Sequence, residues 1–233
     1  MKMKCDVSAY LILGRENTNG RRVAEIVEQA VNAGFTIIQV RSKVESAREL
    51  IEDCREVSKV LEKLGKQNDV CVVVDDRLDV VLACREQGIK VDGIHVGQKD
   101  IPVSVCRKYL GPDAIIGLSA PAKDLIDYVK NYDVSDIDYF GAGPVHETAT
   151  KPDCGMNENG IVIPRTFTEL TELAKVSPVP VVVGGGVKIN DIPPLRNTGV
   201  DGFFVVSAVC AAEDPYGASK ELVDAWKKNP EKK

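Results

Sequence analysis

Short apolar runs alternate with longer amphipathic segments eight times along this chain. The predicted strands cover residues 8–13, 35–40, 71–74, 93–96, 113–118, 137–140, 179–183 and 202–206. The predicted helices cover residues 21–32, 45–66, 77–84, 104–109, 123–132, 165–175, 191–197 and 215–227. Such alternation is typical of a parallel sheet whose strands are joined by crossover helices. Eight repeats predict a closed α/β barrel, the (β/α)8 or TIM barrel. An open doubly wound sheet is the alternative, but its usual glycine fingerprint after the first strand is missing.

The size and composition of the chain suit one globular domain. The chain has 233 residues, of which 44% are hydrophobic and 28% are charged, and these fractions are ordinary for a folded protein. One α/β barrel needs about 250 residues, so we expect a single domain over residues 1–233 with a loosely held tail at 229–233. The net charge of -5 gives no support for nucleic acid as a partner.

The sequence contains no recognisable membrane or export segment. No apolar run approaches the ~20 residues that a membrane-spanning helix needs. The amino-terminal stretch MKMKCDVSAYLIL also has no small-residue cleavage site after its apolar part. We therefore predict a cytoplasmic location and no membrane partner.

The cysteine pattern indicates reduced thiols. The seven cysteines are odd in number and scattered, and no two of them form a CxxC pair. Most fall within strand or helix patterns, where a free cysteine behaves as a small core residue. We expect neither disulfides nor zinc ligands.

Carboxylates follow two neighbouring predicted strands. Asp75 and Asp76 come at the end of the strand at 71–74, and Asp100 comes shortly after the strand at 93–96. Because the carboxyl ends of parallel strands meet at one edge of the sheet, Asp76 and Asp100 could share a hard divalent cation such as Mg²⁺. Capping of the following helix is the alternative for the first pair of acids.

The strand at 35–40 carries polar side chains out of the sheet at alternate positions. Gln39, Arg41 and Lys43 should point the same way, because side chains alternate along an extended chain. An amide, a guanidinium and an ammonium on one side could hold an anion. Solvated charges before a helix are the alternative.

A second anion site is expected after the last two strands. Gly184, Gly185 and Gly186 follow one strand and Val206-Ser207 follows the next, which is where barrels of this class often build a phosphate site from backbone N–H groups. The segment 148–151 lies in a long aperiodic connection and could reach either anion site. Together these sites suggest two phosphorylated substrates, one of them a diphosphate bound with magnesium.

The two histidines have different expected roles. His95 lies inside a predicted strand and favours a core or pocket-wall position over metal ligation. His146 lies in the long connection after the sixth strand, where a surface position, a substrate contact and an acid–base role all remain open.

Taken together, the motifs resemble the thiamine-phosphate synthase family. The resemblance runs in order through IIQVRSK, VVDDRLDVVL, DGIHVGQKD, GLS, DYFGAGPVHETATK, PVVVGGGV and GFFVVSA. It implies a magnesium-dependent transferase that joins a hydroxymethylpyrimidine diphosphate to the nitrogen of a hydroxyethylthiazole phosphate and releases diphosphate. It also implies small-molecule substrates, thiamine biosynthesis as the setting, and a soluble protein that could form homo-oligomers.

The resemblance also implies roles for individual residues. The magnesium ligands would be Asp76 and Asp100, and the residues with catalytic roles would be Arg41, Lys43, Ser119 and Lys151. The implied substrate-binding residues are Gln39, Val40, Arg41, Ser42, Lys43, Asp75, Ser119, Thr148, Ala149, Thr150, Lys151, Gly186, Val206 and Ser207.

Three departures from the family pattern concern the substrate. Asp75 stands where the family usually has Asn, Lys99 where it commonly has Glu, and His146-Glu147 where it has an aromatic residue and a proline. The loop at 152–164 is also longer than usual. Two alternatives therefore stay open: a thiazole tautomerase with His146 as its base, and a barrel that binds a phosphorylated ligand without turnover.

Overall fold

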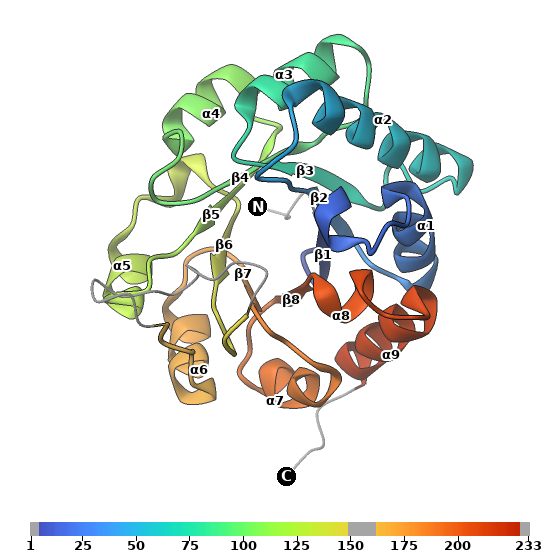
Figure 1. Cartoon of the computed structure of the whole chain (residues 1–233). Coiled ribbons are helices and arrows are strands. Elements are labelled where there is room, and N and C mark those ends of the chain that lie inside the picture. Colours follow the sequence, from blue (N-terminus) through green and yellow to red (C-terminus); the bar gives the residue numbers. More distant parts are fainter. Residues whose placement is uncertain (1–4, 149–161, 229–233) are drawn as a thin grey trace.

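The chain folds into a closed barrel of parallel strands surrounded by helices (Figure 1). The computed structural model describes residues 5–148 and 162–228. Within them, the strands pair in sequence order and β1 closes the barrel by pairing with β8. The strands are β1 (Ala9–Leu13), β2 (Ile37–Val40), β3 (Cys71–Asp75), β4 (Gly93–Val96), β5 (Ile115–Ser119), β6 (Tyr139–Ala142), β7 (Val181–Gly184) and β8 (Gly202–Val205). The predicted (β/α)8 barrel is confirmed.

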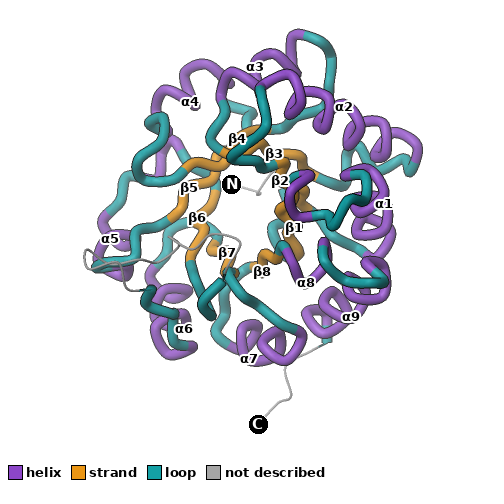
Figure 2. The backbone as a smooth tube through the Cα atoms, in the orientation of Figure 1, coloured by secondary structure: helices purple, strands orange, loops and turns teal. Residues whose placement is uncertain are grey.

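The helices lie outside the strand ring, as Figure 2 shows. The α-helices are α1 (Val23–Ala33), α2 (Ala47–Lys63), α3 (Leu78–Glu86), α4 (Val103–Leu110), α5 (Leu125–Asn131), α6 (Phe167–Val176), α7 (Ile192–Asn197), α8 (Ser207–Cys210) and α9 (Pro215–Lys227). Three 3₁₀ turns add η1 (Arg15–Asn17), η2 (Val134–Asp136) and η3 (Ile189–Asp191). The sequence predicts every long helix but not α8, because four residues are too few to show a helical period.

Local sequence signals explain where α2 begins and where α1 ends. Ser46 and Glu49 form a reciprocal capping box at the start of α2, in which the Glu49 carboxylate accepts from the Ser46 backbone N–H at 2.8 Å. Gly34 ends α1 in the left-handed region with φ +109, a conformation that glycine adopts without strain. These two signals fix the helices on either side of β2.

Helix α3 buries only part of its apolar surface. Leu82 is exposed and Leu78 is only partly buried. The helix packs Val80, Val81 and Cys84 against the barrel. The fold sets this face: a sequence of mostly apolar residues has several equivalent helical stripes, and contact with β3 and β4 selects one.

The core has two layers. The larger one fills the space between the barrel and the helices, and the smaller one lies inside the barrel and includes Tyr10, Ile37, Val73, Tyr139 and Val182. The inner layer fills the lower part of the barrel with side chains, as expected for a barrel of this size. The polar side chains above it therefore gather at the carboxyl ends of the strands.

A disulfide joins Cys5 to Cys71, so the prediction that all cysteines are reduced is wrong. Cys71 is the first residue of β3, and Cys5 lies in the segment before β1 that packs into the inner core layer. The sequence gives no sign of this pairing, because barrel closure alone brings the two residues together. In the described part of the chain, the free cysteines are Cys54, Cys84, Cys106 and Cys210.

Among the described residues, no helix is long and apolar enough to cross a membrane. The tail at 229–233 that was expected to be loosely held lies outside the described residues.

Candidate active site

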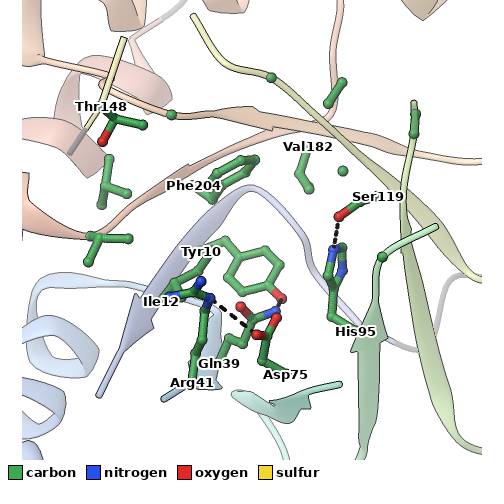
Figure 3. A pocket seen from close by; sticks show the side chains of 18 of the residues that line it. Tyr10, Ile12, Gln39, Arg41, Asp75, His95, Ser119, Thr148, Val182 and Phe204 are labelled. Atoms are coloured by element: carbon green, nitrogen blue, oxygen red, sulfur yellow. Dashed lines mark hydrogen bonds and ion pairs between the residues drawn. The ribbon is translucent and has the colours of Figure 1, made fainter. Parts of the chain in front are cut away.

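A cavity of about 530 Å³ opens at the carboxyl ends of the strands (Figure 3). This volume suits a small-molecule ligand. Its walls include Gln39 and Arg41 from β2 and the residue after it, Asp75 from β3, His95 from β4 and Ser119 from β5. Catalytic groups of (β/α)8 enzymes lie at this face, so the cavity is the candidate active site.

Side chains at the carboxyl end of β2 point alternately into the barrel and away from it. Gln39 donates to the Tyr10 hydroxyl at 2.7 Å and Arg41 faces Asp75, so both lie on the cavity side. Val40 is fully buried on the opposite face, in the core between barrel and helices. Any contact of Val40 with substrate would therefore have to come from its backbone.

Ser42 and Lys43 follow Arg41 at the edge of the cavity. The Ser42 hydroxyl accepts from the backbone N–H groups of Val44 and Glu45 at 3.2 and 3.1 Å, which fixes the turn before α2. Lys43 reaches across to the carboxylates at the end of β3, at 3.4 Å from Asp75 and in direct contact with Asp76. The expected gathering of Gln39, Arg41 and Lys43 on one side is thus present in the structure.

Two cations hold the acidic pair after β3. The Arg41 guanidinium lies 3.1 Å from the Asp75 carboxylate, and both side chains are about nine-tenths buried. Burial alone would lower the pKa of Lys43, but its hydrogen bond to Asp76 and the charge of Asp75 raise it. The positive charges of Arg41 and Lys43 therefore offset the negative charge that Asp75 adds at this position.

Asp76 and Asp100 form an interacting carboxylate pair. Burial alone would raise the pKa of Asp76, but its contact with Lys43 lowers it. Burial, and then the neighbouring Asp76 carboxylate, raise the pKa of Asp100. The Gly97 backbone N–H donates to Asp100 at 2.9 Å and holds it in place. Two acids that repel each other in this way would gain from a shared cation.

The donor set at this pair suits Mg²⁺. Carboxylate oxygens are hard ligands, and Mg²⁺ sites often have only one or two carboxylates, with substrate phosphates and waters completing the shell. In the described residues, no group of three or more His, Cys, Asp or Glu side chains is arranged to hold a metal. Asp76 and Asp100 could therefore hold the ion only together with oxygens from substrate or water.

The opposite wall of the cavity is made of backbone. Gly185 and Gly186 have positive φ values of 88 and 71, and a Cβ on Gly186 would come within 2.9 Å of His146. Glycine is needed at Gly186 for both reasons. The turn faces Val206 and Ser207 at the start of α8. Gly186, Val206, Ser207 and Thr148 all line the cavity. Ala149, Thr150 and Lys151 lie outside the described residues.

The two histidines lie in different surroundings. His95 lines the cavity, with Nδ1 3.1 Å from the Tyr139 hydroxyl and Nε2 2.9 Å from the Ser119 hydroxyl. Its expected position in the pocket wall is confirmed. His146 is about half exposed and its Nε2 lies 3.0 Å from Asp191, outside the residues that line the cavity. Of the three roles left open for His146, the structure favours the surface position.

Several cavity residues were missed by sequence reasoning. Tyr10 and Ile12 project into the barrel from β1, Phe204 projects from β8, and Gln98 and Lys99 form the wall after β4. Alternation along β1 is the only signal that could have found Tyr10, because a single tyrosine in an apolar strand is usually a core residue.

Fold and site together define a single (β/α)8 barrel with a charged cavity at the carboxyl ends of its strands, the arrangement of barrel enzymes. The family described as thiamine monophosphate synthase matches residues 9–209 of this chain. The chain therefore belongs to that family.

Individual relatives agree over nearly the full length. The thiamine-phosphate synthase of Clostridium novyi is 37% identical over 223 residues, which are 95% of this chain and 100% of the relative. The thiamine-phosphate synthase of Natronomonas pharaonis is 35% identical, and the match covers 96% of each chain. The solved structure of thiamine phosphate pyrophosphorylase from Pyrococcus furiosus is 30% identical with a TM-score of 0.76, covering 97% of this chain and 98% of that one.

Proposed function

We propose that this chain is a magnesium-dependent thiamine-phosphate synthase. It transfers the hydroxymethylpyrimidine group from its diphosphate to the nitrogen of hydroxyethylthiazole phosphate, which gives thiamine phosphate and diphosphate. The observation that carries the proposal is the charged group at one edge of the cavity, where Arg41 and Lys43 meet Asp75 and Asp76 beside Asp100. The full-length match to relatives with this name supports it.

The diphosphate end of the first substrate would lie at this charged edge. Asp76 and Asp100 would hold Mg²⁺, which neutralises the leaving diphosphate and so favours its departure. Lys43 lies between the two acidic positions and can turn toward a diphosphate oxygen as the second cation. Arg41 is already oriented by Asp75, so it can present its remaining N–H groups without reorganisation.

The chemistry suits a site without a strong base. Loss of diphosphate leaves a pyrimidine cation that the thiazole nitrogen captures, so the protein must position two substrates and stabilise the departing charge. Ser119 lines the cavity between the charged edge and the glycine turn and would contact the diphosphate substrate. The proposed role of Lys151 concerns a residue outside those that the structure describes.

The thiazole phosphate would lie at the opposite wall. Gly186, Val206 and Ser207 line the cavity there and offer backbone N–H groups, and Thr148 adds a hydroxyl. Placing the two anionic groups at opposite walls leaves the middle of the cavity for the rings that react.

The alternatives are not favoured. A tautomerase needs a base in the cavity, but His146 lies outside the residues that line it and pairs with Asp191. A barrel that only binds was motivated by the extra charge of Asp75, yet Arg41 and Lys43 offset that charge. A cytoplasmic location and homo-oligomer formation remain predictions.

Product formation from the two substrates, with and without chelator, tests the proposal. Asp76 has φ +58, a left-handed conformation that Asn tolerates, so Asp76→Asn removes the charge without straining the backbone. We expect magnesium-dependent thiamine phosphate from the wild type and a loss of at least about 100-fold in Asp76→Asn, as for removal of a group that stabilises the transition state.

Asp79→Asn is the matched control, because Asp79 is exposed on α3 and pairs only with Arg77 among the contacts of the described chain. It should keep wild-type activity. Wild-type protein that binds the thiazole phosphate but forms no product, with magnesium present, would overturn the proposal.

A further inference from the structure

A continuous chain of hydrogen bonds runs across the barrel along the wall of the cavity. Gln39 donates its amide N–H to the Tyr10 hydroxyl at 2.7 Å, and the hydroxyls of Tyr10 and Tyr139 are 2.9 Å apart. Tyr139 is 3.1 Å from Nδ1 of His95. Nε2 of His95 is 2.9 Å from the Ser119 hydroxyl (Figure 3). Each of these five side chains comes from a different strand. We refer to them as the relay.

The amide of Gln39 sets the direction of the relay. A phenol has one proton to give, and burial raises the pKa of both Tyr10 and Tyr139, so both hydroxyls keep that proton. Because the Tyr10 oxygen accepts from Gln39, its O–H donates a hydrogen bond to the Tyr139 oxygen. The Tyr139 O–H then donates a hydrogen bond to Nδ1 of His95. With Nδ1 an acceptor, the imidazole carries its proton on Nε2 and donates to Ser119.

We propose that the relay holds His95 as its neutral Nε2–H tautomer and thereby makes Ser119 a hydrogen-bond donor to the bound ligand. The Ser119 oxygen accepts from His95, so the Ser119 proton is left to point into the cavity. Tyr139 is the positioning residue, because it is not among the residues that line the cavity and would act on the ligand through His95 and Ser119.

Two glycines make room for the relay. A Cβ on Gly117 would lie 2.2 Å from the Tyr139 ring and 2.4 Å from Nδ1 of His95, and a Cβ on Gly141 would lie 3.0 Å from the His95 ring. The two rings stack with centroids 5.5 Å apart in the slot that these glycines leave. The barrel wall is therefore shaped around the contact between Tyr139 and His95, and its hydrogen bond is confined to one geometry.

The far end of the relay is also held. Gln98 donates to the Ser119 carbonyl oxygen at 2.7 Å, and Tyr128 donates to the Gln98 side chain at 3.1 Å. The Ser119 backbone is therefore fixed from the cavity rim while its hydroxyl is fixed from below.

A fixed donor selects the ligand. This step rests on the proposed function: the diphosphate substrate must place an acceptor against Ser119, either a phosphate oxygen or an unprotonated ring nitrogen. A ligand that offers only an N–H there leaves the Ser119 proton without a ligand acceptor and binds less tightly, since an unmade buried hydrogen bond is costly.

Nitrogen NMR of histidine-labelled protein tests the relay without any substrate. The chain contains two histidines, and a His146→Gln variant assigns the second signal. At neutral pH we expect His95 to show a protonated Nε2 and an unprotonated Nδ1. In Tyr139→Phe the Nδ1 atom loses its donor, and the share of the Nε2–H tautomer should fall. Tyr109→Phe, an exposed tyrosine on α4, should leave both signals unchanged.

Gln39→Glu tests the direction of the relay. An ionised carboxylate can only accept, so every bond of the relay would reverse and the proton of His95 would move to Nδ1. A wild-type His95 that is protonated on Nδ1, alone or on both nitrogens, overturns the proposal even if the variants do not fold.

Kinetics test the effect on the ligand. We expect Tyr139→Phe to raise KM for the diphosphate substrate about fivefold, the loss of one neutral hydrogen bond, and to leave KM for the thiazole phosphate unchanged. Equal changes in both constants, or none, would contradict the ligand step. A wild type without product would refute the proposed function, whereas the NMR result would still decide the relay.

Discussion

At the scale of single residues, the buried ion pair between Arg41 and Asp75 decides how this site handles its extra negative charge. Both side chains are about nine-tenths buried and lie 3.1 Å apart, and Lys43 lies 3.4 Å from the same carboxylate. An isolated carboxylate beside a diphosphate would repel it. In this ion pair, Asp75 orients the Arg41 guanidinium but also neutralises part of its positive charge.

Asp75→Asn should separate these two effects. The neutral amide can still accept from Arg41, so we expect a modest loss of about 1–3 kcal/mol in the free energy of unfolding, measured in urea. Because the charge of Arg41 is no longer partly neutralised by Asp75, KM for the diphosphate substrate should fall about 3- to 10-fold, equivalent to about 1 kcal/mol. A rise in KM would show instead that the ionised carboxylate is needed to orient Arg41.

Residue-level features were predicted from the sequence only where strand alternation places them. Gln39, Arg41, Asp76 and Asp100 could be assigned to one edge of the barrel because parallel strands end together. The relay through Tyr10 could not be predicted, since the contact between Tyr10 and Tyr139 joins β1 to β6 across the closed barrel.

At the scale of elements, the order of strands and helices was predicted because each has a clear period. Some helix ends differ from the prediction, because packing determines them: α2 ends at Lys63 rather than at residue 66. The strands that α3 covers also determine which of its side chains are buried. Short elements such as α8 escape any periodic test. The connection before α2 also holds an acidic cluster that the sequence did not reveal.

That cluster joins the loop after β1 to the start of α2. Arg15 lies 2.7 Å from Asp53 and 3.4 Å from Glu45, and Glu45 Oε2 is buried without a hydrogen-bond partner in the described chain. Burial and the neighbouring Asp53 carboxylate raise the pKa of Glu45 to about 7. The folded state therefore keeps a proton on Glu45 at pH values where the unfolded chain has lost it. The stability that this proton contributes is present at acid pH and is lost as the pH rises through about 7.

Glu45→Gln should mimic the protonated form at every pH. We expect the variant and the wild type to unfold at similar temperatures near pH 5, and the variant to gain about 2–4 °C at about pH 8, which corresponds to about 1 kcal/mol. Thermal unfolding across this pH range measures the difference. Glu49→Gln, which removes the exposed capping carboxylate of α2, is the control and should lack this pH dependence above pH 6 because the pKa of Glu49 is lowered. A gain of Glu45→Gln that is largest at acid pH would contradict the assignment.

At the scale of the whole molecule, the barrel separates stability from function. The candidate site occupies the carboxyl ends of the strands, whereas the Cys5–Cys71 disulfide joins the amino-terminal segment to the first residue of β3 at the opposite end. The position of the candidate site was predicted from the sequence, because its residues belong to motifs that follow strands. The disulfide was not predicted, because two cysteines 66 residues apart have no pairing signal until the barrel forms.

The disulfide should stabilise the fold without affecting turnover. A cross-link over 66 residues restricts the unfolded chain, and its loss typically costs about 2–4 kcal/mol, or about 5–15 °C in Tm at this chain length. Reductant should therefore lower the Tm of the wild type and of a Cys106→Ala control by this amount but leave Cys5→Ser unchanged, while the rate of product formation at 25 °C stays the same in all three. A digest of unreduced protein should contain the linked Cys5 and Cys71 peptides. If the digest lacks them, or if reductant leaves the wild-type Tm unchanged, the amino-terminal segment is held by packing in the inner core layer alone.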